Sequence, residues 1–439
     1  MKKLMQNLFL LSSILFFMLP ESASALPSFT RQTGKSCTVC HIQNTPKLNG
    51  YGRNFSLSGY ANYNSNSETQ SLIEGAEVTL GMPSVLNVSA VLKARYVKTT
   101  NSLDINGSYD LGTERGELQV LEGSGLYFAG RIADNIGGII SIIGDPSTEN
   151  DVALGGKAIL SYPTFNGFGG ISLYSTQING TFSGMENFNT GLNAPLKQFE
   201  NAYVTNAAQA TGIANGPATG LQLYYGDNNL FATLGVTIPS QNNEGIDAGG
   251  ALIPFGRVSY NMSVSDWNFM LGAYGLAGDV KASDQSLDGG LIDGAAKLIN
   301  IYKEGYGFDF EATGSILDMQ TMTTINVVLK NIIDVTPISS LTSTNLQQTN
   351  NRATSVEFQI NPILPLGVKV AYLNYNNKDE TAVTREFVKA YDFNAYSFGL
   401  NYLVRQNITL DAEYSYIEPD EQTLIENYYD FYLVATLAF

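Results

Sequence analysis

Apolar and polar residues alternate along most of the chain, from about residue 84 to the C-terminus. In one segment Ile408, Leu410, Ala412, Tyr414 and Tyr416 interleave with Thr409, Asp411, Glu413 and Ser415. Residues 306–312 and 354–360 repeat this pattern. A period of two residues predicts β-strands with one apolar face and one polar face.

The predicted strands and their connections fit a closed barrel. The strands begin near residues 84, 117, 136, 151, 167, 219, 229, 254, 267, 304, 320, 353, 366, 393, 406 and 427. Short connections near 226–228, 265–266 and 405–406 alternate with long ones around 98–116, 177–218, 278–303 and 333–352. Bacterial outer-membrane barrels have an even number of strands, short periplasmic turns and long outer loops. We therefore expect an all-β transmembrane barrel of about sixteen antiparallel strands, with its N-terminus on the periplasmic side.

Two further features bear on this barrel. The longest connection, residues 177–218, contains only three charged residues, Glu186, Lys197 and Glu200. It is either a mobile outer loop or a loop folded inward to narrow the lumen, as in plugged porins. The last strand ends at Phe439, and a terminal aromatic residue on the lipid-facing alternation resembles the C-terminal signal of bacterial outer-membrane barrels.

The start of the chain predicts export. Two lysines precede an apolar run over residues 8–19, and residues 23–25 (Ala-Ser-Ala) offer a cleavage site typical of signal peptides. Nothing after residue 25 approaches the roughly 18 consecutive apolar residues of a helical membrane span. The expected organisation is a signal peptide over 1–25, a short N-terminal segment with its linker over 26–72, and an outer-membrane barrel over 73–439.

Composition narrows the function. The 439 residues include 24 Lys+Arg and 40 Asp+Glu, and this acidic balance excludes a nucleic-acid binder, which needs cations opposite the phosphates. A hydrophobic share of 44% excludes a disordered chain. Two cysteines and one histidine exclude a disulfide framework, and also a Ser/His/Asp triad beside a separate histidine metal site.

Both cysteines and the only histidine stand together in the run Cys37-Thr38-Val39-Cys40-His41. C-x-x-C-H is the attachment sequence of c-type haem, in which two thiols form thioether bonds and the histidine binds the iron. A chance match, a redox C-x-x-C and a zinc site are the alternatives. No βαβ pattern surrounds the motif, and no fourth Cys or His exists for zinc. We expect one covalent haem c, with Cys37 and Cys40 as attachment residues and His41 as axial ligand.

No second histidine exists for the sixth position of the haem iron, and residues 26–60 contain no methionine. Met82 precedes the first strand on the periplasmic side, and strand phase places Met270 and Met322 inward near periplasmic turns. These three are the candidate sixth ligands, although methionine is more often a packing residue. Met262 has outward phase, and Met185 fits only if the long loop reaches deeply inward. Another donor, water or an open position are the alternatives.

Residues 26–60 are too few to bury a haem in a core of their own, so the barrel must complete the site. They carry Arg31, Lys35, Lys47 and Arg53 and no acidic residue, whereas residues 61–439 carry 18 basic and 39 acidic residues. This complementarity predicts a cationic cytochrome segment that plugs the periplasmic mouth of an anionic barrel. The alternative is that the four cations neutralise haem propionates.

Residues 27–34 (PSFTRQTG), the C-x-x-C-H motif, residues 51–55 (YGRNF) and residues 59–60 (GY) together resemble the fused monohaem cytochrome-porins of bacterial outer membranes. The motifs cover only residues 27–60, whereas the architecture covers the whole mature chain. The resemblance implies electron uptake from an extracellular donor, with Fe(II) the substrate of the best-known members. It carries Cys37, Cys40 and His41 over as haem ligands, and Arg31, Gln32, Gly52 and Arg53 only as motif positions.

The expected function is therefore an electron-transfer cytochrome in outer-membrane lipid, which takes electrons from Fe(II) and passes them to a periplasmic carrier. Five carboxylates with inward strand phase would concentrate cations in the lumen, although a hydrated porin lumen has similar residues: Asp309, Glu311, Glu357, Asp411 and Glu413. Two alternatives stay open. One is a haem-plugged porin that transports solutes or senses redox state, and the other is a cytochrome for an organic or protein donor.

Overall fold

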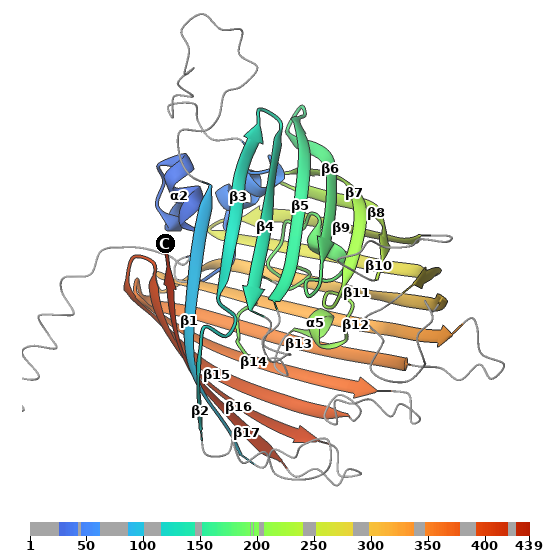
Figure 1. Ribbon diagram of the computed structural model, residues 1–439. Coiled ribbons are helices and arrows are strands. Elements are labelled where there is room, and N and C mark those ends of the chain that lie inside the picture. Colours follow the sequence, from blue (N-terminus) through green and yellow to red (C-terminus); the bar gives the residue numbers. More distant parts are fainter. Residues whose placement is uncertain are drawn as a thin grey trace, which may run out of the picture.

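The protein folds as one antiparallel sheet closed into a barrel (Figure 1). The structure, a computed structural model, describes residues 26–42, 45–61, 87–100, 116–144, 152–193, 195, 197–201, 206–239, 252–283, 298–337, 347–377, 392–419 and 427–439. The predicted signal peptide and most of the predicted linker lie outside these residues.

Among the described residues, seventeen strands occupy sixteen positions in the barrel wall. The first part of the sheet consists of β1 (Val88–Thr100), β2 (Glu117–Val120), β3 (Gly125–Ala133), β4 (Ile136–Gly144), β5 (Val152–Pro163), β6 (Gly167–Thr176), β7 (Ala218–Asp227), β8 (Leu230–Ile238) and β9 (Ile253–Val264). The second part consists of β10 (Trp267–Ser283), β11 (Leu298–Ile316), β12 (Met319–Pro337), β13 (Gln347–Ile363), β14 (Leu366–Asn377), β15 (Phe393–Arg405), β16 (Ile408–Pro419) and β17 (Tyr428–Ala438). Strands β2 and β3 both pair with β1, so they form one interrupted position.

The first and last strands close the barrel. Strand β1 pairs with β17 from Val91 opposite Ala438 to Thr100 opposite Tyr429. Backbone hydrogen bonds between Ala90 and Phe439 continue this seam by one residue. The prediction of about sixteen antiparallel strands in a barrel is therefore confirmed.

Short turns lie at one end of the barrel and long connections at the other. Turns such as residues 228–229, 265–266 and 406–407 join neighbouring strands, and the end they share is called the short-turn end. Strands β10 to β13 extend beyond their predicted starts and ends, into the stretches 278–303 and 333–352 that the sequence assigned to loops. In these stretches the outward face is no longer apolar and the inward face is no longer polar: Tyr302 and Glu304 point outward, and Ile301 points inward. The sequence pattern therefore does not predict a strand there.

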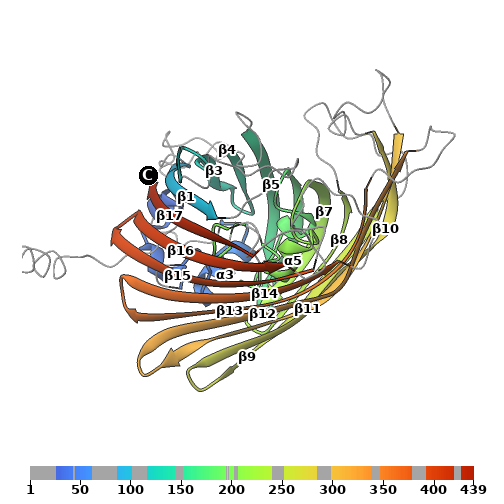
Figure 2. The same cartoon turned by 90° about the horizontal axis from the view of Figure 1, so that it is seen from below.

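The two faces of the wall follow the predicted phase. Outward Tyr306 and Phe308 are 42% and 50% exposed, whereas inward Asp309 and Glu311 are each 2% exposed. Other parts of the chain, among them helices α3 and α5, lie inside the barrel (Figure 2), and their buried side chains pack against the inward side chains of the wall.

The connection between β6 and β7 is described at residues 177–193, 195, 197–201 and 206–217. These residues, called the lumen loop below, fold into the lumen and include the short helices η2 (Thr181–Ser183) and α5 (Ala207–Ala210). Phe182 of this lumen loop packs edge-on against Phe255 and Tyr274 of the wall, with ring centroids 5.4 and 5.9 Å away. The interpretation of an inward-folded loop is confirmed, and that of a mobile outer loop is wrong.

Residues 26–61, called the N-terminal segment below, also lie inside the barrel, near the short-turn end. The segment contains α2 (Pro27–Thr33), η1 (Cys37–Val39) and α3 (Gly50–Leu57). Helix α2 packs against β1 and β3, and α3 packs against β6 and β7. Within the described part of the chain, no helix is long and apolar enough to cross a membrane.

Candidate functional site

A single tight turn brings the three motif residues together. The backbone N–H groups of Cys40 and His41 both donate to the Cys37 carbonyl, at 3.1 and 3.0 Å. Both thiols are free, and Cys37 Sγ lies 3.7 Å from Thr30 Oγ1 on helix α2. The turn therefore presents two thiols and an imidazole from five consecutive residues, which is the donor set that a c-type haem needs.

The His41 ring is oriented for metal binding by its own segment. His41 Nδ1 lies 2.9 Å from the Pro46 carbonyl oxygen. Since a carbonyl only accepts, Nδ1 carries the proton and Nε2 keeps its lone pair. Burial disfavours the charged ring and lowers the pKa of His41 to about 4, so the imidazole is neutral. A backbone acceptor at the second nitrogen is typical of histidines that bind metals, so the residues fit the haem that the motif predicts.

Asn49 fastens helix α3 to the motif. Its side-chain oxygen accepts from Gly52 N–H at 3.0 Å as the helix N-cap, and its side-chain nitrogen donates to the Val39 carbonyl at 3.0 Å. Its backbone N–H donates to the Cys40 carbonyl at 2.9 Å. Gly52 lies against that same carbonyl, and a Cβ at position 52 would collide with it.

Lys47 links the segment to the barrel wall. Its ammonium group lies 2.8 Å from Glu357 Oε2 of β13, and the two side chains are 1% and 7% exposed. Thr324 of β12 donates to the same carboxylate oxygen. The Lys47 carbonyl accepts from Ile42 N–H, next to His41, at 2.9 Å. The wall thus holds the stretch that carries the hydrogen-bond acceptor of His41.

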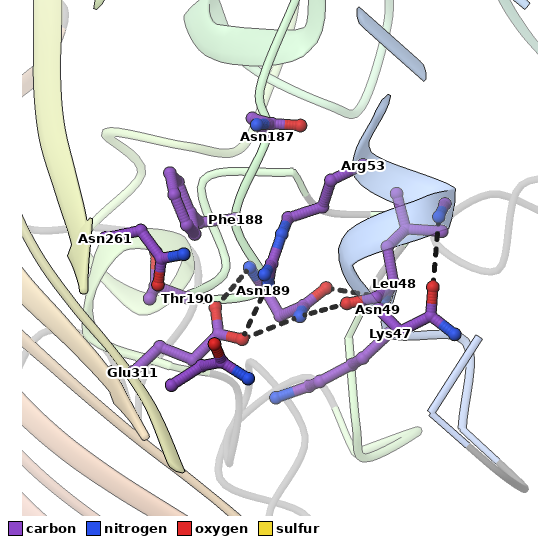
Figure 3. Close-up of polar contacts among 12 residues, drawn as sticks. Lys47, Leu48, Asn49, Arg53, Asn187, Phe188, Asn189, Thr190, Asn261 and Glu311 are labelled. Atoms are coloured by element: carbon purple, nitrogen blue, oxygen red, sulfur yellow. Dashed lines mark hydrogen bonds and ion pairs between the residues drawn. The ribbon is translucent and has the colours of Figure 1, made fainter. Parts of the chain in front are cut away.

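The lumen loop also binds this stretch of the segment. Asn189 pairs with both backbone groups of Leu48, and Glu311 of β11 binds Asn189 (Figure 3). Arg53 Nη1 lies 3.3 Å from Glu311 Oε1, and its guanidinium group stands 5.2 Å from the centre of the Phe188 ring. Glu311 therefore joins the loop, the wall and helix α3.

The other two cations of the segment lie elsewhere. Exposed Arg31 donates to the Val88 carbonyl at the start of β1, and Lys35 stands 5.5 Å from the centre of the Tyr51 ring. Charge complementarity with the barrel is thus confirmed for Lys47 and Arg53. Neutralisation of haem propionates stays a prediction for the segment.

Apolar side chains also pack the N-terminal segment against the lumen loop and the barrel wall. One buried cluster contains residues of the segment, the lumen loop and the wall: Phe55, Leu57, Tyr60, Ile159, Met185, Phe188, Tyr224, Phe231 and Met270. The Leu57 carbonyl accepts hydrogen bonds from Ser161 and Tyr224 of the wall, at 2.8 and 2.7 Å. A Cβ at Gly226 of β7 would lie 2.7 Å from Leu57, so the wall is shaped to this side chain.

The structure places four of the methionines discussed above. Met270 and Met322 are each 2% exposed and face inward, whereas Met262 is 46% exposed, as strand phase predicts. Met270 belongs to the cluster that the segment completes, and Met322 does not. Met185 also belongs to this cluster, and its sulfur accepts a hydrogen bond from Ser56 of helix α3 at 3.9 Å. The lumen loop therefore reaches deeply inward, which is the condition for Met185 to be a candidate ligand. Met82 lies outside the described residues.

The inward carboxylates bind protein cations. Asp309 pairs with Arg257 at 2.5 Å, and Lys369 lies 2.5 Å from Glu413 and 3.5 Å from Asp411. Glu311 and Glu357 bind the N-terminal segment, as described above. Among the residues that the structure describes, no three His, Cys, Asp or Glu side chains are grouped to hold a metal ion. The predicted inward phase of these five carboxylates is confirmed. Each lies beside a Lys or Arg side chain of the protein itself, a pairing that the sequence does not reveal because the partners are distant in sequence.

A small polar cavity of about 180 Å³ lies between the segment and two short turns. Asn49 and Arg53 line it on one side, and Asp266, Asn268 and Gln320 line it on the other. Sequence reasoning did not assign roles to Asn49 or Asn189. The first has a local signal, because Asn is a preferred helix N-cap, whereas the partners of Asn189 are far away in sequence.

Comparison with known proteins shows similarity in fold only. No family model matches the chain, and no curated protein matches it. Among solved structures, the outer-membrane channel DcaP of Acinetobacter baumannii has a TM-score of 0.48 at 13% identity, over 80% of this chain and 96% of that chain. The loop-deletion mutant OmpTdeltaL8 of Vibrio cholerae has a TM-score of 0.47 at 12% identity, over 80% and 98%. An anion-selective porin of Comamonas acidovorans has a TM-score of 0.44 at 11% identity, over 80% and 98%.

Proposed function

We propose that this protein is an electron-transfer cytochrome of the bacterial outer membrane. Cys37 and Cys40 would hold a single haem c, and through it electrons from an extracellular donor would reach a periplasmic carrier. One observation carries the proposal: the segment that contains the C-x-x-C-H turn is bound to the inner wall of a closed barrel through Lys47 and Arg53, and its His41 Nδ1 is bound to the Pro46 carbonyl. Fe(II) as the donor rests on the resemblance of residues 27–60 to the fused cytochrome-porins.

When bound, the haem supplies reversible one-electron chemistry at its iron. Cys37 and Cys40 would provide the sulfurs of the two thioether bonds, and His41 Nε2 would provide a nitrogen ligand to the iron. The Pro46 carbonyl keeps the proton on His41 Nδ1. Met82, Met270, Met322 and Met185 are the methionine candidates for the sixth position. Phe55 and its buried cluster exclude water from this side of the segment.

Location in the outer membrane is supported by the outward face of the wall. A barrel that satisfies all its backbone groups between strands can cross a lipid bilayer. Side chains such as Leu234, Leu271 and Phe308 are 50 to 65% exposed on the outside of the barrel. Such an apolar surface suits lipid and is unfavourable in water. With short turns in the periplasm, the N-terminal segment would face that compartment.

Solute transport is less well supported. The lumen loop and the N-terminal segment both bury apolar and charged side chains against the inner wall, which leaves packed protein where an open porin has water. This packing is unfavourable for an open channel, in which solutes need a hydrated path through the lumen.

The test uses the full chain purified in detergent. A c-type optical spectrum should be present in the wild type and absent from the variant Cys37→Ser/Cys40→Ser. Anaerobic Fe(II) should reduce the haem within seconds, whereas a panel of organic reductants and reduced carrier proteins should act more slowly. If the wild type carries no covalent haem, the proposal is wrong. If haem is present but another donor reduces it faster than Fe(II), the cytochrome function stands and the donor is corrected.

A further inference from the structure

The amide side chain of Asn189 takes the place of a neighbouring β-strand for one residue of the N-terminal segment. Leu48 N–H donates to Asn189 Oδ1 at 2.7 Å, and Asn189 Nδ2 donates to the Leu48 carbonyl at 2.9 Å. Asn189 is itself fixed, because its backbone N–H and its Nδ2 donate to the two oxygens of Glu311, at 3.1 and 3.0 Å. At 1% exposure, Asn189 has no water to replace these bonds.

The stretch that Asn189 holds is the one that orients the axial histidine. Leu48 forms an antiparallel bridge with His41, and Lys47 accepts from Ile42 N–H, so residues 46–48 run beside residues 41–42. Pro46 lies two residues before Leu48, and its carbonyl accepts the hydrogen bond from His41 Nδ1 at 2.9 Å. The position of this carbonyl is therefore coupled through two residues to Asn189.

Resting on the function proposed above, we infer that Asn189 of the lumen loop is a positioning residue for the haem: through Leu48 and Pro46 it fixes the orientation and basicity of His41. Glu311 completes the chain by fixing Asn189 to the barrel wall. The barrel and its loop then contribute to the properties of the haem iron without touching it.

The expected direction follows from the hydrogen bond to His41. A firm acceptor at Nδ1 makes the imidazole a more basic ligand, and a more basic ligand favours Fe(III) over Fe(II). If the Asn189 pairing is lost, residues 46–48 loosen and this hydrogen bond weakens. The midpoint potential of the haem should therefore rise.

Three variants of the full-length holoprotein in detergent separate this role from packing. Asn189→Ala removes the amide, and Asn189→Leu removes it while keeping a side chain of similar volume. Gln198→Ala is the matched control, since Gln198 is a buried amide of the same loop that donates to Gln359 of the wall at 2.6 Å rather than to the backbone of the segment. The readouts are the midpoint potential, the low-spin ferric EPR signal and the rate of hydrogen exchange at the Leu48 amide.

We expect both Asn189 variants to raise the potential, broaden the EPR signal and speed exchange at Leu48, while Gln198→Ala behaves as wild type. Recovery of the wild-type potential in Asn189→Leu would assign the effect to packing and overturn the inference. Equal potentials in all four proteins would overturn it as well, with the proposed function intact. If the Asn189→Ala protein does not fold or acquire haem, the comparison of Asn189→Leu with wild type provides the test. A wild type without covalent haem removes the proposed function, and this inference with it.

Discussion

Lys47 Nζ and Glu357 Oε2 lie 2.8 Å apart, and neither side chain reaches solvent to any extent. Residue 47 belongs to the N-terminal segment and residue 357 to the middle of β13. Removal of one partner of a buried ion pair leaves the other charge without compensation, at a cost of about 3–5 kcal/mol. This pair should therefore be a principal anchor of the segment inside the barrel.

We predict that Lys47→Met weakens docking of the N-terminal segment by about 3–5 kcal/mol. Limited proteolysis in detergent would measure it, as the fraction of molecules cleaved within residues 26–61. The double variant Lys47→Met/Glu357→Met should recover most of the protection, because a packed apolar pair can replace a buried ion pair. Arg131→Ala is the control, since its partner Asp134 is 88% exposed and exposed pairs contribute at most about 1 kcal/mol. Equal loss of protection in Lys47→Met and Arg131→Ala would contradict the prediction.

We predict that Gly52→Ala greatly lowers covalent haem attachment. The added Cβ would collide with the carbonyl oxygen and carbon of Cys40. Because these two are backbone atoms, helix α3 must move away from the motif. Gly50→Ala is the matched control in the same helix, because a Cβ at position 50 meets nothing within 4 Å. Alanine is also the better helix former, by about 1 kcal/mol. Haem per barrel, measured by the haem absorbance of purified protein, should fall only in Gly52→Ala; an equal fall in both variants would exclude the steric explanation.

We predict that a methionine ligand, if the iron has one, is Met185 or Met270. These two belong to the buried cluster that the N-terminal segment completes, whereas Met322 lies outside it. Leucine is close to methionine in volume, so each substitution should leave the packing largely intact. One of Met185→Leu and Met270→Leu should remove the methionine–iron charge-transfer band of the ferric spectrum, and Met322→Leu should keep it. Loss of the band in Met322→Leu alone would show the choice of cluster to be wrong.

We predict that Glu200 of the lumen loop stabilises the protein above pH 4.5 and progressively less below it. Burial by itself would raise the pKa of Glu200, but Lys197 and Lys93 outweigh burial and hold that pKa below its usual value of 4.5. A carboxyl with a depressed folded-state pKa adds stability above its unfolded pKa, and this stability is lost as pH falls toward the folded value.

The comparison of wild type with Glu200→Gln between pH 7 and pH 3 tests this, with thermal unfolding in detergent as the measurement. The advantage of the wild type should be constant above about pH 4.5 and shrink below it. A constant advantage down to pH 3 would mean that Glu200 acts through packing rather than charge.

The barrel could be predicted because its signal is local and repeated. The pattern also predicts correctly which face single residues occupy, since Met270 faces the lumen and Met262 faces outward. The ends of β11 and β13 were missed because polar residues occupy the outward positions there, and the alternation no longer separates the faces. Hydrophobic pattern locates a strand only where its two faces meet different solvents.

The candidate site could be predicted only in part. Cys37, Cys40 and His41 can be recognised in the sequence because five consecutive residues contain the whole motif. Their supports do not, because Asn189, Glu311 and Glu357 are contributed by the lumen loop and two strands that fold toward the motif. The low charge of the lumen loop was compatible with an inward or an outward position, and only its contacts with the wall decide between them.

The contacts of Leu57 with the barrel wall determine whether the N-terminal segment can be transferred to another barrel. Ser161 and Tyr224 bind its carbonyl, and Gly226 leaves room for its side chain, so the wall is complementary to this one segment. A chimera that joins residues 26–61 to a different porin barrel would lack these three residues and the carboxylates that face Lys47 and Arg53. The N-terminal segment and the barrel wall are thus complementary to each other, and exchange of either one should require redesign of the other.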